Sequence, residues 1–124
     1  MGYYPVKIRP TDRNFSRYIR RNGICEMYSM YGIECSPKLE CAHYHGRGKE
    51  STRFDTENAY CLCFNHHKKT HENKSIFTEF MKNKLGKESY ALLELKSNTT
   101  KKRDDKMDKI IISSLLERVG LKWN

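Results

Sequence analysis

Hydrophobic residues recur at helical spacing near the start of the chain and through its second half, whereas the stretch between them has no such period. The first periodic segment predicts a helix that runs from a cap at Thr11 or Asp12 to about Arg21, where Asn22 and Gly23 end it. Apolar positions three and four residues apart mark the face of a helix that turns inward. We expect that face to consist of Phe15, Tyr18 and Ile19.

The second half of the chain predicts four further helices. They run from about Asn65 to residues 72–74, over residues 75–84, from about Lys87 to Leu95, and over residues 104–119. Ser75 is expected to cap the second of these helices, and Gly86 and Gly120 are suitable residues for helix ends. The last helix carries an apolar stripe that we expect to lie in the core or against a partner helix, formed by Met107, Ile110, Ile111, Leu115 and Val119.

The middle of the chain, residues 24–60, has irregular patterning with short segments that favour β structure. One such segment covers residues 39–45, and it is followed by a flexible basic loop at residues 46–49. At 124 residues the whole chain should form one domain with a modest core. The sequence therefore predicts a small α+β fold with helices on both sides of an irregular centre.

Composition narrows the class of protein. No apolar run is long enough to cross a membrane, and the N-terminal residues lack the features of a secretory signal. We therefore expect a cytoplasmic protein, in a bacterium or a phage-infected host cell, with no membrane partner. The five cysteines are an odd number in a chain without a signal, which favours metal ligands over a disulfide framework.

The net charge of +9 indicates an anionic partner. Six lysines or arginines lie between Lys7 and Arg21 against one aspartate, and six lie between Lys96 and Lys109 against three. A nucleic acid would neutralise such charge and would bind with a strong salt dependence. Arg17, Arg20 and Arg21 of the first helix are candidate DNA contacts, and a solvated basic surface is the plainer alternative.

A zinc site is indicated by the spacing of cysteine and histidine. Cys63 and His66 form one short-spaced pair, and Cys25 is the candidate start of the other. The position that would complete the first pair is Tyr28, a poor zinc ligand, so Cys35 or Cys41 must serve instead. We favour Cys35, because Cys41 shares a strand face with His43. The alternative is that zinc has been lost and these thiols pack as small apolar side chains; Cys61 is expected to pack inside in either case.

A second metal site is predicted beside the first. His67 and His71 are four residues apart, which places both imidazoles on one face of a helix, where they can hold a divalent ion with positions open to water and phosphate. Upstream, His43 has a side chain that is partly neutral near pH 7, and it is the best candidate for a general base.

The ordered set of motifs resembles the HNH endonucleases, and more narrowly the phage recombination nucleases of the NinG/Rap type. The resemblance spans about residues 13–98, and it rests on these segments: Phe15 to Arg21, Cys25, Leu39 to Arg47, Thr52 to Asn58, Cys63 to His67, His71, and Phe77 to Leu95. It implies a ββα-metal core at residues 24–74, preceded by a basic segment and helix at 1–23 and followed by a helical extension at 75–124.

The resemblance also assigns roles. His43 corresponds to the general base, Asn58 to the asparagine that fixes the hairpin loop, and His67 and His71 to the metal-binding histidines. The expected ion is Mg2+ or another divalent metal, and the zinc is structural. Many members carry a metal ligand directly before the base, where this chain has Ala42. Glu40 or His45 could replace it.

The expected function is therefore metal-dependent hydrolysis of DNA phosphodiester bonds in phage recombination, replication or packaging. Arg47, Lys49 and Arg53 surround the predicted hairpin and are further candidate phosphate contacts, or else solvated loop residues. Two other classes stay open: a non-catalytic zinc-stabilised module that binds DNA, and a helical adaptor that acts through residues 104–119. A homodimer through the last helix is a further expectation.

Overall fold

The computed structural model describes residues 6–124 and has the small α+β fold expected from the sequence. The first five residues of the predicted N-terminal segment, 1–5, lie outside the described part. Within residues 6–124, none of the helices is both long enough and apolar enough to span a membrane. The elements are α1 (Pro10–Ile19), β1 (Leu39–His43), α2 (Glu50–Arg53), β2 (Ala59–Cys63), α3 (Phe64–Glu72), α4 (Lys74–Leu85), α5 (Lys87–Ser97) and α6 (Asp105–Arg118).

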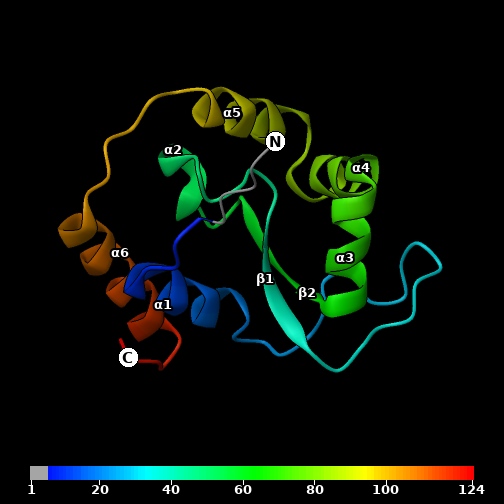
Figure 1. The fold of residues 1–124 in the computed structure, drawn as a ribbon, viewed down its shortest axis with the longest axis horizontal. Helices are drawn as coiled ribbons and strands as arrows, with labels where there is room; N and C mark the ends of the chain where they lie inside the picture. The colour runs from blue at the N-terminus through cyan, green and yellow to red at the C-terminus, as the bar shows by residue number, and fades with distance from the viewer. Residues whose placement is uncertain (1–5) are drawn as a thin grey trace.

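Strands β1 and β2 form a two-stranded antiparallel sheet at the centre of the molecule, with α3 continuing directly from β2 (Figure 1). Ala42 pairs with Tyr60 and Cys41 with Cys61. Each of the five residues of β2 is buried. An isolated two-stranded sheet is marginal in water, so the helices that cover it supply most of the apolar burial.

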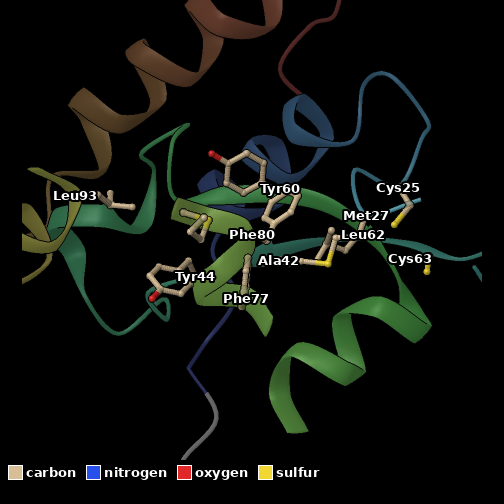
Figure 2. Packing of buried hydrophobic residues seen from close by; sticks show 11 residues of the cluster. Cys25, Met27, Ala42, Tyr44, Tyr60, Leu62, Cys63, Phe77, Phe80 and Leu93 are labelled. Carbon is tan, nitrogen blue, oxygen red and sulfur yellow. The ribbon is translucent and has the colours of Figure 1, made fainter. Parts of the chain in front are cut away.

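Two hydrophobic clusters cover the sheet. The larger lies between the strands, α4 and α5, and includes Tyr44, Tyr60, Leu62, Phe77 and Phe80, as Figure 2 shows. The smaller joins the sheet to α1 and α6, and its buried members are Phe15, Ile19, Ala59, Cys61, Ile112 and Leu116. Helices α1 and α6 lie side by side although they come from opposite ends of the chain (Figure 1). The sheet thus separates two packed layers.

The predicted helices are present, but two of their N-caps differ and one short helix is additional. Arg9 occupies the N-cap position of α1 that was predicted for Thr11 or Asp12, and the Asp12 carboxylate accepts a hydrogen bond from the Arg9 N–H at 2.8 Å. Asn73, and not Ser75, caps α4, because its side-chain oxygen accepts from the Ser75 N–H. The short helix α2 follows the basic loop and was not predicted; four residues are too few to show helical periodicity.

The apolar stripe predicted on the last helix does not lie in the core, and its contact with a partner helix stays a prediction. Met107, Ile110, Ile111 and Val119 are exposed, and Leu115 is half-buried. The buried face of α6 instead carries Ile112 and Leu116, which pack with α1. Because apolar residues occupy nearly every side of this helix, spacing alone cannot select the buried face.

Candidate metal centre and basic cleft

Four side chains meet beside the junction of β2 and α3. They are Cys25, Cys35, Cys63 and His66, and their ligand atoms all lie within 4.8 Å of one another. The sulfurs of Cys63, Cys35 and Cys25 lie 3.1, 3.5 and 3.7 Å from Nδ1 of His66. A tetrahedral zinc site with normal bond lengths separates sulfur and nitrogen ligands by about 3.6 Å. The cluster can therefore hold a metal ion such as zinc.

The tautomer of His66 suits a metal ligand. Its Nε2 lies 3.0 Å from the backbone carbonyl oxygen of Met30, which can only accept a hydrogen bond. Nε2 must therefore carry the proton, and Nδ1 presents its lone pair to the three sulfurs. A backbone carbonyl that fixes the ring in this way is a common second partner of metal-binding histidines.

The three thiols of the cluster differ in acidity. Burial alone would raise the pKa of Cys63, but hydrogen bonds from the backbone N–H groups of His66 and Ser36 contribute to lowering it to about 6. Burial raises the pKa of Cys25, and burial together with the neighbouring thiols raises the pKa of Cys35 to about 12. The thiolate form of Cys63 is thus favoured even without a metal ion. A bound cation would favour the thiolate forms of Cys25 and Cys35 as well.

Of the two candidates for the first zinc pair, the structure brings Cys35 to the cluster and leaves Cys41 outside it. Cys41 lies on β1 opposite Cys61, and neither belongs to the set of ligand atoms near His66. Cys61 is buried in the smaller hydrophobic cluster, as predicted. Cys35 reaches the cluster from the loop between α1 and β1, whose course the sequence pattern did not predict.

A cleft of about 690 Å³ runs along the edge of β1, between α1 and α3. Three of the histidines singled out in the sequence line it: His43, His67 and His71. Its basic side chains are Arg13, Arg20, Lys38 and Arg47, against the two carboxylates of Asp12 and Glu40. Positive charge and imidazole groups therefore share one concave surface.

His67 and His71 are adjacent on α3, and their Nε2 atoms lie 3.1 Å apart. Nδ1 of His67 lies 2.7 Å from the carboxylate of Glu40 on β1, to which it donates. In the neutral ring, Nε2 of His67 is then unprotonated. Two imidazole nitrogens bound to one ion at normal bond lengths are about 3 Å apart, so this pair fits a shared cation.

His43 is held in a defined orientation on the cleft wall. Its Nε2 lies 3.1 Å from the backbone carbonyl oxygen of Arg53, to which it donates, so the neutral ring keeps its lone pair on Nδ1. Burial lowers the pKa of His43 to about 4, and the positive charge of Arg47 adds to this effect. The ring is therefore a neutral proton acceptor at physiological pH.

Asn58 is fully buried and ties together the loop that connects the strands. Its amide nitrogen donates to the carbonyls of His45 and Thr52, and its amide oxygen accepts from the His45 N–H, at 2.9 to 3.1 Å. These bonds hold the two ends of the loop between β1 and β2. His45 itself turns its ring toward Glu94 of α5 at 2.7 Å and does not line the cleft.

The predicted DNA-contacting residues occupy different environments. Arg20 and Arg47 line the cleft. Arg17 donates to the carbonyl oxygen of Lys122, Arg21 stacks over Tyr18, and Lys49 is exposed at the start of α2. None of these three is among the residues that line the cleft.

Arg53 is neither a solvated loop residue nor free for a phosphate, because its side chain is only 1% exposed. Its guanidinium donates twice to the buried carboxylate of Asp12, and also to the carbonyls of Lys7 and Arg47. Because the carbonyl oxygen of Arg53 also accepts from His43, this arginine joins α1, the loop after β1 and the histidine. Asp12 and Arg53 are 41 residues apart, and nothing in the sequence around either residue predicts that they pair.

Comparisons with protein-family models, with curated proteins and with solved structures gave no match. The site is therefore interpreted from its own residues.

Proposed function

We propose that the protein is a metal-dependent DNA endonuclease with an HNH-type ββα-metal core formed by β1, β2 and α3. The observation that carries the proposal is that His43, His67 and His71 line one basic cleft. A hydrolytic site for phosphodiesters needs a proton acceptor, a divalent ion and positive charge around the phosphate. The cleft offers residues suited to each of these tasks.

His43 acts as the general base. Its Nδ1 takes a proton from water as the water oxygen attacks phosphorus, and the bond from phosphorus to the 3′ oxygen breaks. The products are a 5′-phosphate and a 3′-hydroxyl, which takes up a proton from solvent. Support comes from the hydrogen bond to the Arg53 carbonyl, which leaves Nδ1 as the free nitrogen, and from the lowered pKa, which keeps the ring neutral.

His67 and His71 would hold the divalent ion, Mg2+ or a similar metal, through their Nε2 atoms. When bound, such an ion stabilises negative charge on the phosphate and on the leaving oxygen. Glu40 orients His67, in the way that carboxylates support metal-binding histidines. Glu40 thus supports a ligand, while His45 lies outside the cleft and is no replacement for the ligand missing at Ala42.

The substrate is DNA, held by the cationic side chains of the cleft. Arg13, Arg20, Lys38 and Arg47 lie around the histidines and would contact phosphates on either side of the cut. The zinc cluster has a structural role, because it fixes the loop before β1 to the start of α3, which carries His67. The setting proposed from the sequence, phage recombination, replication or packaging, follows from the resemblance alone.

Cleavage of defined DNA tests this proposal. The purified protein, with Mg2+, Mn2+ or Ni2+, is incubated with supercoiled plasmid, single-stranded and branched DNA. Nicking that depends on the ion and leaves 5′-phosphate ends is expected.

A second candidate, a non-catalytic zinc-stabilised module that binds DNA, is favoured by Ala42, which is fully buried and offers no ligand. It would bind DNA with a steep salt dependence and leave every substrate uncut.

A further inference from the structure

A second cavity lies between the start of α1 and the start of α6, next to the C-terminal segment. It has a volume of about 490 Å³, and its lining includes Trp123, Arg13, Arg103 and Lys109. Arg13 lines both this cavity and the basic cleft, so the two hollows adjoin at that side chain. The proposed hydrolysis uses none of Trp123, Arg103 or Lys109.

Trp123 is the single tryptophan of the chain, and its neighbours hold it in place. The carbonyl oxygen of Lys122 accepts from Arg17 at 2.6 Å, and that of Asn124 accepts from Arg13 at 2.8 Å. The backbone N–H of Asn124 donates to the side chain of Asn14 at 2.9 Å. The indole also packs against the smaller hydrophobic cluster while it lines the cavity. An aromatic ring fixed in this way binds a partner at little entropic cost.

The charge of the cavity is strongly positive. Four cationic side chains line it against the single carboxylate of Asp105. Two of the four are already paired, Arg9 with Glu50 at 2.6 Å and Arg103 with Asp105 at 2.7 Å. Arg13 donates to the Asn124 oxygen, but among residues 6–124 no aspartate or glutamate forms an ion pair with Arg13 or Lys109. The Lys109 ammonium lies over the Trp123 ring, 5.3 Å from its centre, so a base that stacks on that face would displace it toward the flanking phosphates.

We propose that this cavity binds an unpaired nucleotide of single-stranded DNA. The base stacks on Trp123, and its flanking phosphates lie against Arg13 and Lys109. Aromatic side chains within a positive groove are how proteins bind single strands without reading their sequence. The inference rests on the proposed function and extends it, because a strand in the basic cleft would reach the cavity past Arg13. The substrate would then carry at least one unpaired base within reach of the cavity.

The single tryptophan permits a direct test by fluorescence. The His43→Ala protein, in which the proposed base is removed, is titrated without divalent ion with an oligothymidylate, with an abasic oligonucleotide of equal phosphate number, and with duplex DNA. Stacking predicts that oligothymidylate quenches the tryptophan emission and binds roughly tenfold more tightly than the abasic strand. The abasic strand should bind through its phosphates and leave the emission nearly unchanged.

Variants separate stacking from charge. Trp123→Leu keeps apolar packing and should lose the preference for oligothymidylate, measured by anisotropy of labelled DNA, whereas Trp123→Phe should retain part of it. Tyr28→Ala removes an exposed aromatic ring that does not line the cavity, and this variant should keep the full preference for oligothymidylate. Thermal melts identify a folded variant for the comparison. Equal affinity for abasic and base-containing strands, or an undiminished preference in folded Trp123→Leu, would overturn the proposal.

The two proposals fail separately. Base-dependent quenching without cleavage of any DNA, with any ion, would overturn the endonuclease and support the nucleotide site. Cleavage by the wild-type protein together with equal binding of abasic and base-containing strands would overturn the nucleotide site alone.

Discussion

The carboxylate of Glu40 accepts a hydrogen bond from Nδ1 of His67 over 2.7 Å, which links strand β1 to helix α3 across the floor of the basic cleft. Hydrogen bonding to His67 and the charge of Lys38 lower the pKa of Glu40, although burial alone would raise it. The glutamate is therefore ionised at neutral pH and fixes the ring so that Nε2 faces His71. This contact positions a histidine pair for a cation.

Glu40→Ala should therefore weaken divalent-ion binding at His67 and His71. Removal of a supporting carboxylate costs about 10- to 100-fold in metal affinity. Calorimetric titration of the zinc-loaded protein with Mn2+ measures the effect. Glu72→Ala is the matched control, since Glu72 is an exposed glutamate at the end of the same helix. Equal Mn2+ affinity in Glu40→Ala and wild type would show that the carboxylate has no such role.

Zinc content should distinguish Cys35 from Cys41. Cys35→Ser removes one of the four clustered ligands, whereas Cys41→Ser changes a thiol outside the cluster. Structural zinc contributes about 10–16 kcal/mol in zinc-finger peptides, which matches or exceeds the whole stability of a typical domain, about 5–15 kcal/mol. Elemental analysis should find one zinc per chain in the wild type and in Cys41→Ser. Cys35→Ser should lack zinc and melt at a much lower temperature, as should Cys63→Ser.

Zinc bound equally by Cys35→Ser and wild type would contradict the four-ligand site. Soluble wild-type protein without zinc would contradict it as well.

The buried pair of Asp12 and Arg53 should make stability depend on pH. Burial alone would raise the pKa of Asp12, but hydrogen bonds from Arg53 and the Arg9 N–H lower it below its ordinary value of 3.8. Because the pKa is lower in the folded state, the stabilisation is complete above that ordinary value and is lost as pH falls through the folded pKa. Asp12→Asn, which leaves the Arg53 charge buried without a partner, should cost about 3–5 kcal/mol at pH 7.

Urea melts of the wild type and Asp12→Asn, from pH 7 to pH 2, measure this difference. The gap in unfolding free energy should be constant down to about pH 5 and should shrink below it. Asp105→Asn, at an exposed ion pair, is the control and should change stability little at any pH. A gap that does not change with pH would contradict the assignment.

The imidazole of His43 should have a pKa well below that of an ordinary histidine. Its pKa of about 4 follows from burial, and it compares with an ordinary value of 6.5. NMR titration of the imidazole signals in zinc-loaded protein measures it directly, and His43→Asn identifies the signal by its loss. A midpoint near 4 is expected. A midpoint between 6 and 7 would mean that the ring is solvated or ion-paired, in conflict with its packed position.

The sequence predicted most of the helices and the four residues of the cysteine and histidine cluster. Helices α3 to α6 lie close to their expected bounds because capping residues, glycines and apolar spacing all act locally. The pairing of Cys63 with His66 is likewise local. The preference for Cys35 over Cys41, which rested on the strand face that Cys41 shares with His43, is confirmed, although the loop that brings Cys35 to the cluster has no periodicity that predicts its course.

Long-range polar contacts were the least predictable features. Asp12 and Arg53 are 41 residues apart, and nothing in either segment marks them as partners. Arg53 looked like a loop residue because charged side chains are rarely buried unless paired. The contact of Glu40 with His67 depends on how β1 lies against α3. The sequence did not identify the buried face of α6, because the helix is apolar on several sides.

Single-turnover cleavage by the wild type and by His43→Ala tests the proposed chemistry most directly. Both proteins, loaded with zinc, are mixed with branched DNA and saturating Mn2+, and their DNA affinity and melting temperature are measured in parallel. If His43 is the base, His43→Ala should cleave at least about 100-fold more slowly, which is the lower end for a general base, while binding and melting stay close to wild type. Cleavage at the wild-type rate by folded, DNA-binding His43→Ala would contradict the assignment, and a wild type that cuts no DNA would contradict the endonuclease.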